Sequence, residues 1–248
     1  MTAKYAAYRL ANILFSRGYP LYRPLYSGWK AFADRDERRF LRAVLKPGMT
    51  VVDVGANIGI YTRFFAREIG STGRVHAFEP AQQNFLRLEA AVRGLGNAVA
   101  NHAAVGERSG TTTLFLSDRL NVDHRTFDSG DGRAGVAVKQ VALDDYFPAA
   151  TRVDVMKVDV QGFELQVLQG ARRLMTENAG VTILMEFWPY GLAQASTRPC
   201  DLIHFARALG FSVRPISSTS SPSIEQMLAA PRALESYWNI VLARSDAS

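Results

Sequence analysis

The sequence predicts an α/β protein built on a doubly wound, seven-stranded sheet with helices on both faces. Short runs rich in β-branched residues alternate along the chain with segments whose apolar residues recur at helical spacing. This alternation is typical of parallel strands that are covered by helices. The first run also leads directly into a glycine turn containing Gly55 and Gly59, and the turn at that place in such a sheet is where ligands bind.

Seven apolar runs are expected as the strands. They are residues 50–54, 74–78, 99–102, 153–159, 181–187, 213–216 and 238–243. Helices are expected where apolar residues fall three and four positions apart, within 34–45, 58–69, 85–95, 167–174 and 202–209. One segment breaks the alternation. Residues 111–141 hold two short runs around a polar stretch at 117–134, which predicts an inserted β-hairpin with a long tip.

Residues 1–46 are expected to form a basic helical extension in front of a domain of residues 47–248. They hold ten Lys and Arg against three Asp and Glu, so the extension carries +7 and the remaining residues sum to −1. Contact with an anionic partner, such as a membrane surface or nucleic acid, is one interpretation. The interpretation we favour is an arm that packs its Leu and Tyr side chains on the main domain.

Composition excludes several classes of protein. The chain has 248 residues with 48% apolar and 21% charged residues, which suits one packed domain. A single cysteine, Cys200, excludes an internal disulfide framework and a cysteine-based zinc cluster. No run approaches the ~18 apolar residues of a membrane span, and the N-terminus lacks a secretory pattern. We therefore expect a cytoplasmic protein.

The turn after the first strand carries the strongest chemical information. Glycines at Gly55 and Gly59 permit positive φ and a close approach of the backbone to a ligand. Glu79 ends the second strand, where a carboxylate can accept hydrogen bonds from a ribose diol. The third glycine of a dinucleotide-binding turn is absent, and Asp53 would repel a pyrophosphate. An acid at this place suits a ligand with a cationic amino-acid tail, which points to S-adenosylmethionine.

Several stretches, taken in order, resemble the FkbM-type methyltransferase family. The most distinctive is Lys157-Val158-Asp159-Val160-Gln161-Gly162-Phe163-Glu164. The others are residues 53–59, 78–80, 103–106, 143–145 and 186–189. A loop at 121–125 is similar to an Asn-x-Gly-Asp-His-Arg loop of many members but lacks its glycine. The resemblance covers about residues 47–243 and says almost nothing about the substrate.

The resemblance implies a class I methyltransferase (Rossmann-like) fold with S-adenosylmethionine as donor and a hydroxyl as the usual acceptor. It implies that Asp53, Gly55, Asn57 and Gly59 contact the methionine end of the cofactor. It also places Glu79 at the ribose and the backbone near Ala104 at the adenine. No metal is assigned, because the acids and histidines show no tight ligand spacing.

Four side chains are candidates for the chemistry of the acceptor. A hydroxyl must lose its proton during methyl transfer, which calls for a base. Asp159, at the end of the fourth strand, and His124, in the polar loop, are the two candidates for that base. Lys157 shares a strand face with Asp159, and Glu186 ends the neighbouring strand, so these two are expected to orient the site. Structural ion pairs are the alternative interpretation for these residues.

The predicted acceptor is a sugar or a glycosylated small molecule. A polyketide, a peptide or RNA is the alternative acceptor, and a cofactor-binding scaffold without turnover is the alternative class of protein. Nucleic acid is disfavoured because Val160-Gln161-Gly162 stands where base amino-group methyltransferases carry an Asn-Pro-Pro-Tyr motif. Peripheral membrane contact through the N-terminus and an oligomeric state both stay open.

Overall fold

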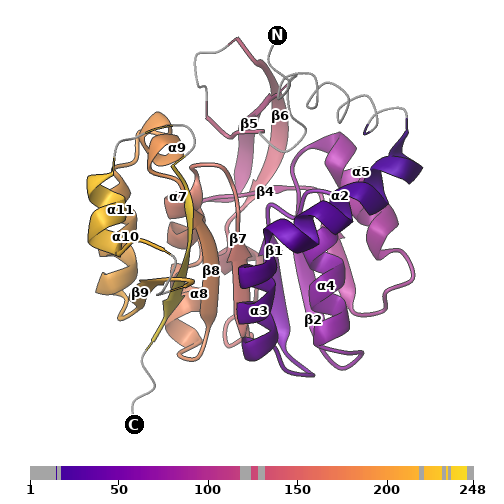
Figure 1. Cartoon of the computed structure of the whole chain (residues 1–248), viewed down its shortest axis with the longest axis horizontal. Coiled ribbons are helices and arrows are strands. Elements are labelled where there is room, and N and C mark those ends of the chain that lie inside the picture. Colours follow the sequence, from indigo (N-terminus) through magenta and orange to yellow (C-terminus); the bar gives the residue numbers. More distant parts are fainter. Residues whose placement is uncertain are drawn as a thin grey trace.

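A seven-stranded sheet runs through the centre of the protein, with helices on both of its faces (Figure 1). The computed structural model describes residues 15, 18–117, 124–127, 132–217, 221–230, 233 and 236–244. The strand order is β3-β2-β1-β7-β8-β10-β9. The first five strands of this order pair in parallel, and β10 is antiparallel to both of its neighbours. The predicted doubly wound sheet is confirmed.

The strand bounds agree closely with the sequence prediction. They are β1 Thr50–Val54, β2 Arg74–Phe78, β3 Ala98–Asn101, β7 Val155–Val158, β8 Thr182–Phe187, β9 Ser212–Pro215 and β10 Trp238–Ala243. The central strands are buried on both faces because alternate residues enter two separate cores. Val52 and Met156 enter the larger core on one face, whereas Val51 and Val155 enter the other.

Helices cover both faces of the sheet. Their bounds are α2 Tyr19–Ala33, α3 Arg35–Val44, α4 Ile60–Glu68, α5 Gln82–Val92, α6 Leu143–Tyr146, α7 Glu164–Gln169, α8 Arg172–Glu177, α9 Pro189–Gln194, α10 Pro199–Ala208 and α11 Ile224–Ala229. They differ from the prediction mainly in short helices, such as α6, α9 and α11, that were not predicted. The single helix expected around 167–174 is in fact two, α7 and α8. The chain breaks at Gly170, where an added Cβ would lie 2.0 Å from the carbonyl oxygen of Gly106.

The predicted hairpin is present and belongs to a second, smaller sheet. Strands β5 (Gly110–Leu116) and β6 (Ala134–Val141) pair antiparallel from Gly110↔Gln140 to Leu116↔Ala134. A two-residue strand, β4 (Ala104–Val105), was not predicted and pairs in parallel with β6. Because β4 directly follows β3, the hairpin is attached beside the edge of the main sheet that ends in β3.

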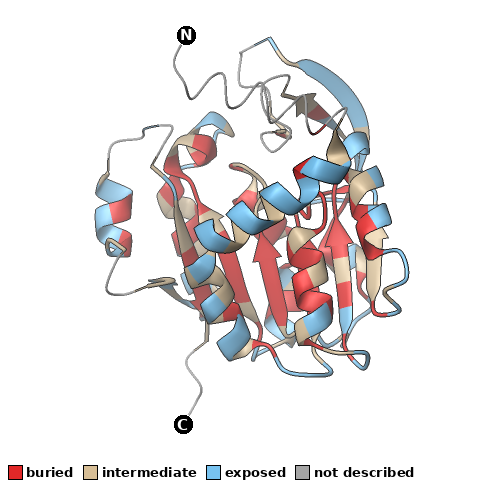
Figure 2. Cartoon of the chain, turned by 45° about the vertical axis from the view of Figure 1, so that its right-hand side comes forward, coloured by how far each residue is buried: buried red, intermediate tan, exposed pale blue. Residues whose placement is uncertain are grey.

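The helices α2 and α3 pack on the body through apolar side chains. Leu41 of α3 is completely buried in the core that also holds Val51 and Phe65. Tyr22 of α2 is buried against Ile58. The outward faces of these two helices, in contrast, are largely exposed to solvent (Figure 2). The predicted domain boundary between residues 46 and 47 stays a prediction.

Candidate active site

A cavity of about 1270 Å³ lies at the carboxyl ends of the parallel strands. The strands end here together because they run in parallel, so residues far apart in the sequence line one space. Nine of the ten predicted site residues line it: Asp53, Gly55, Asn57, Glu79, Ala104, His124, Lys157, Asp159 and Glu186. The exception is Gly59, which begins α4.

The glycine turn brings the ends of β1 and β7 into direct contact. Gly55 has φ +78°, and an added Cβ would lie 1.9 Å from the carbonyl oxygen of Asp159. The backbone N–H groups of Gly55 and Ala56 both donate to the carbonyl of Phe78 at 3.0 and 2.9 Å. Glycine is therefore required at position 55 for packing and for backbone conformation.

Gly59 has a different structural role from the rest of the turn. Its φ is +80°, and an added Cβ would meet Leu88 at 3.0 Å and Ala91 at 3.2 Å. Both of these residues lie on α5. Gly59 thus lets α4 pack closely on α5, and its predicted contact with a cofactor stays a prediction.

The Glu79 carboxylate is bound to two backbone amides. One oxygen accepts from Asn57 N at 2.9 Å, and the other accepts from Ala81 N at 2.9 Å. Burial raises the pKa of Glu79 to about 7, although these hydrogen bonds oppose the shift. The carboxylate therefore fixes the shape of the turn as well as facing the cavity.

Two buried acceptor atoms beside the turn have no hydrogen-bond partner among the described residues. They are Oδ1 of Asp53 and Oδ1 of Asn57. The other carboxylate oxygen of Asp53 accepts from the Thr62 hydroxyl at 2.6 Å. Buried acceptors are rarely left unsatisfied in proteins. Since both residues line the cavity, they fit a ligand that brings N–H or O–H donors, as the ammonium end of S-adenosylmethionine does.

A polar cluster lies directly beside the glycine turn, at the end of β7, where Lys157 is paired in register with Asp53 of β1. Lys157 Nζ lies 3.1 Å from the Asp159 carboxylate and 4.8 Å from the centre of the Tyr61 ring. The Gln161 side-chain amide donates to Asp159 at 3.1 Å and to Glu186 at 3.0 Å. Gln161 was not predicted as a site residue, because it lies in the turn after β7, with φ +56°, where the period of a strand gives no information.

The two carboxyl groups of this cluster have opposite pKa shifts. Burial favours the neutral form of Asp159, but the charges of Lys157 and Lys30 hold its pKa below the usual range. Burial raises the pKa of Glu186 well above its usual range, and the neighbouring carboxylates Asp159 and Glu164 add to this effect. Asp159 therefore ionises more readily than Glu186, and such a difference suits two acids to different roles.

His124 also faces the cavity, and its hydrogen bonding decides its tautomer. Ser117 N donates to Nδ1 of His124 at 3.0 Å. The neutral ring therefore carries its proton on Nε2, which makes that nitrogen a hydrogen-bond donor. The role of His124 as a base stays a prediction. The next residue, Arg125, is buried, with its guanidinium 5.1 Å from the Trp188 ring centre. Sequence analysis gave Arg125 no role.

The helices α2 and α3 complete the cavity wall, which the sequence did not predict. Tyr26, Trp29 and Lys30 of α2 line the cavity together with Asp34. Lys30 Nζ lies 3.0 Å from the Asp34 carboxylate, and that carboxylate accepts from the Tyr61 hydroxyl at 2.9 Å. A polar network thus connects the extension to the turn and strand ends that hold the predicted site residues.

Residues 53–212 match the family model described as the methyltransferase FkbM domain. The chain belongs to this family. The matched stretch contains every residue predicted for the site, from Asp53 to Glu186, and excludes α2 and α3. The family predicted from the motifs is confirmed.

Two curated relatives of this FkbM-domain protein are fungal methyltransferases. It is 29% identical over 144 residues to methyltransferase 1 of Beauveria bassiana and 29% identical over 157 residues to methyltransferase sdnD of Sordaria araneosa. Each match covers 48% of this chain. The FkbM-domain protein spans 57% and 59% of the lengths of these two relatives.

The fold of the FkbM-domain protein is similar to that of a solved methylase structure, as expected for the class I methyltransferase fold. A putative rRNA methylase from Clostridium thermocellum superposes with a TM-score of 0.52 at 15% identity, over 85% of this chain and 95% of that one. A S-adenosylmethionine-dependent O-methyltransferase from Thermotoga maritima gives a TM-score of 0.47 at 15% identity, over 86% of this chain and 66% of the other. At these identities the likeness describes the fold.

Proposed function

We propose that this protein transfers a methyl group from S-adenosylmethionine to a hydroxyl of a sugar or a glycosylated small molecule. The observation that carries the proposal is the arrangement of one cavity. The glycine turn with its unsatisfied acceptors and the Asp159–Gln161–Glu186 cluster lie side by side in its lining, at the ends of the adjacent strands β1 and β7.

The residues at the turn are suited to hold the cofactor. Asp53 and Asn57 offer acceptors for its ammonium group, and Glu79 offers a carboxylate for the ribose diol. The backbone at Ala104, buried beside β6, would border the adenine. When bound, S-adenosylmethionine supplies a methyl group that is already activated by the sulfonium charge.

Asp159 is the proposed acceptor of the hydroxyl proton. It is held ionised by Lys157 and Lys30, and its side chain is 31% exposed, at the cavity. A hydroxyl oxygen becomes strongly acidic as it gains a methyl group, so a carboxylate of low pKa is a sufficient base. Glu186 in its protonated form and Gln161 would orient the acceptor by hydrogen bonds, with His124 as a further donor.

The remaining walls support a polyhydroxylated acceptor. Tyr22, Tyr26 and Trp29 of α2 form a stack with ring centres 5.2 and 5.8 Å apart, and all three line the cavity. Flat aromatic faces pack against the C–H faces of sugar rings, while carboxylates and amides pair with the hydroxyls. Cavities that combine apolar walls with a few polar groups are the usual form of small-molecule sites.

The test is methyl transfer from labelled S-adenosylmethionine to a panel of sugars and glycosylated compounds, with products identified by NMR. An O-methyl product supports the proposal. Transfer to nitrogen, or to RNA in preference to every saccharide, would overturn it. Calorimetric titration with S-adenosylmethionine in parallel separates a wrong acceptor from a failure to bind the cofactor.

A further inference from the structure

The outer face of α2 carries a stripe of exposed apolar side chains. Leu21, Leu25, Trp29 and Phe32 are 66%, 67%, 61% and 72% exposed. Their positions follow the helical repeat, so they form one stripe along the helix. Leaving four large apolar side chains in water on one helix is unfavourable. An exposed apolar patch of this kind marks an interaction site.

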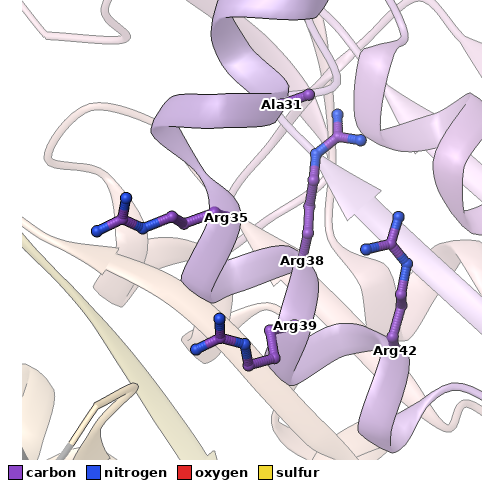
Figure 3. A pocket seen from close by; sticks show the side chains of 5 residues that line it. All are labelled: Ala31, Arg35, Arg38, Arg39 and Arg42. Carbon is purple, nitrogen blue, oxygen red and sulfur yellow. The ribbon is translucent and has the colours of Figure 1, made fainter.

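The next helix, α3, carries four arginines on one face. Arg35, Arg38, Arg39 and Arg42 are spaced i, i+3, i+4 and i+7, and together with Ala31 they line a hollow of about 360 Å³. Figure 3 shows these side chains around the hollow, with Arg38 and Arg42 pointing in the same direction. The spacing gathers four positive charges on a single surface.

The acidic residues near α3 neutralise only some of these four arginines. Asp34 faces inward to Lys30 and Tyr61, and Glu37 accepts from Asn239 of β10. Arg39 and Arg42 have carboxylate neighbours at 3.6 and 3.4 Å. Within the described part of the chain, Arg35 and Arg38 form no ion pair.

The apolar stripe and the arginines form one continuous surface, which we name the α2–α3 face. The guanidinium of Arg35 lies 5.7 Å from the centre of the Phe32 ring, so the two parts meet where α2 ends and α3 begins. Figure 2 shows the exposed sides of both helices turned the same way. Trp29 belongs to the stripe and also lines the large cavity, so the face borders the opening of that cavity.

We infer that the α2–α3 face binds the surface of an anionic lipid bilayer. Apolar side chains of a helix that lies in the plane of a membrane enter the boundary between headgroups and acyl chains. Arginines beside them bind lipid phosphates and gain from the negative surface potential. Among the described helices none is long and apolar enough to cross a bilayer, so the contact is peripheral.

A bilayer would bind both the apolar stripe and the arginines of the α2–α3 face, whereas the other partners considered would account for only one of these two features. RNA phosphates would pair with the arginines but would leave Leu21, Leu25 and Phe32 in water. A second copy of the chain would cover the leucines but offers no reason for Arg35, which has no carboxylate partner among the described residues. The inference does not depend on which hydroxyl is methylated.

The experiment is co-sedimentation of the full chain with vesicles. One set is phosphatidylcholine alone, and the other is phosphatidylglycerol and phosphatidylcholine at about one to two. Binding is expected only to the anionic vesicles and should weaken as salt rises above about 0.1 M. Arg35→Gln with Arg39→Gln should weaken binding roughly 25-fold, at about fivefold for each charge. Leu21→Ser with Leu25→Ser and Phe32→Ser should weaken it more than about tenfold.

Matched controls come from exposed residues elsewhere on the chain. Leu86→Ser with Leu228→Ser removes two partly exposed leucines of α5 and α11, and Arg93→Gln with Arg108→Gln removes two exposed charges. These variants should bind nearly as the wild type does, and thermal unfolding checks that all variants fold. Equal binding to neutral vesicles, an equal loss in the controls, RNA binding that displaces the vesicles, or a dimer abolished by the α2 changes would each overturn the inference.

Discussion

The carboxylates of Asp159 and Glu186 share one hydrogen-bond donor, the side-chain amide of Gln161, at 3.1 and 3.0 Å. Two acids so close together cannot both ionise easily. Lys157 and Lys30 stabilise the charge on Asp159, while burial and that charge raise the pKa of Glu186. This difference agrees with the separate roles expected for the two acids, Asp159 as a candidate base and Glu186 as a residue that orients the site.

Asp159→Asn is expected to slow methyl transfer about 10²-fold or more, because the ionised acceptor of the proton is removed. Cofactor affinity should change little. Glu186→Gln is the matched change, and it should retain far more activity because an amide resembles a protonated carboxyl group. Single-turnover rates at saturating cofactor measure both. Equal losses in the two variants, or a larger loss in His124→Ala, would contradict the assignment of Asp159 as the base.

Lys157→Met is expected to raise the pKa of Asp159, because the main positive charge beside it is lost. Asp159 then takes up a proton at a higher pH, so the acid limb of the pH–activity profile should move to higher pH. Lys30→Met removes the charge that affects the pKa of Asp159 less, so the acid limb should shift in the same direction by a smaller amount. Profiles of kcat/KM against pH measure both, and an unmoved acid limb in Lys157→Met would argue against Asp159.

Gly55→Ala is expected to destabilise the protein by about 3 kcal/mol or more. The new Cβ would lie 1.9 Å from the Asp159 carbonyl oxygen in a backbone with φ +78°, so both contact and conformation are unfavourable. Gly94→Ala is the control, because φ is +83° and no atom lies within 4 Å of the added Cβ. It should cost only about 1–2 kcal/mol. Urea unfolding measures the difference between the two variants. An equal loss of stability in both would mean that the backbone of the turn can shift to accommodate the new Cβ.

Glu79→Ala is expected to weaken the binding of S-adenosylmethionine by about 1–3 kcal/mol, or up to about 100-fold in affinity. Part of this loss comes from the turn, since Asn57 N and Ala81 N lose their acceptor. Glu79→Gln keeps an acceptor for one of the two amides and should lose less. Calorimetric titration measures the affinities, and unchanged binding in Glu79→Ala would remove the ribose assignment.

The sequence predicted the sheet well because its signals are local. Runs such as Thr50–Val54, Arg74–Phe78 and Trp238–Ala243 begin and end in the structure where the residue pattern changes. The short strand β4 was missed because a two-residue strand has no period. The break at Gly170 was missed because it depends on the approach of Gly106, which is distant in sequence.

The residues of the candidate site also fall into those that a local sequence pattern could predict and those that depend on contacts between distant parts of the chain. Strand-end residues such as Asp53 and Asp159 could be placed at one edge because parallel strands end together. The part played by α2 could not be predicted, since no pattern within Tyr19–Ala33 says which strand ends it will face. The low pKa of Asp159 is due mainly to Lys157, but it is also due in part to Lys30, which comes from that unpredicted wall.

Glu164→Gln is expected to make the protein more stable at high pH and to flatten the dependence of its stability on pH. Glu164 is completely buried, and one oxygen accepts from Gly162 N at 3.1 Å and Val160 N at 3.3 Å. Burial raises its pKa from the usual 4.5 to about 7. The folded protein therefore holds this proton more tightly than the unfolded chain does, so the contribution to stability is full below pH 4.5. It is lost as the pH rises toward 7, by up to about 3 kcal/mol.

A glutamine at position 164 can still accept from both amides and has no proton to lose. The slope of the unfolding free energy between about pH 4.5 and 7 should therefore fall in the variant, as urea titrations at several pH values will measure. Glu177→Gln is the control, because Glu177 is an exposed residue in an ion pair with Arg173, and it should leave the slope nearly unchanged. A slope identical to that of the wild type in Glu164→Gln would mean that Glu164 is ionised inside the folded protein at neutral pH.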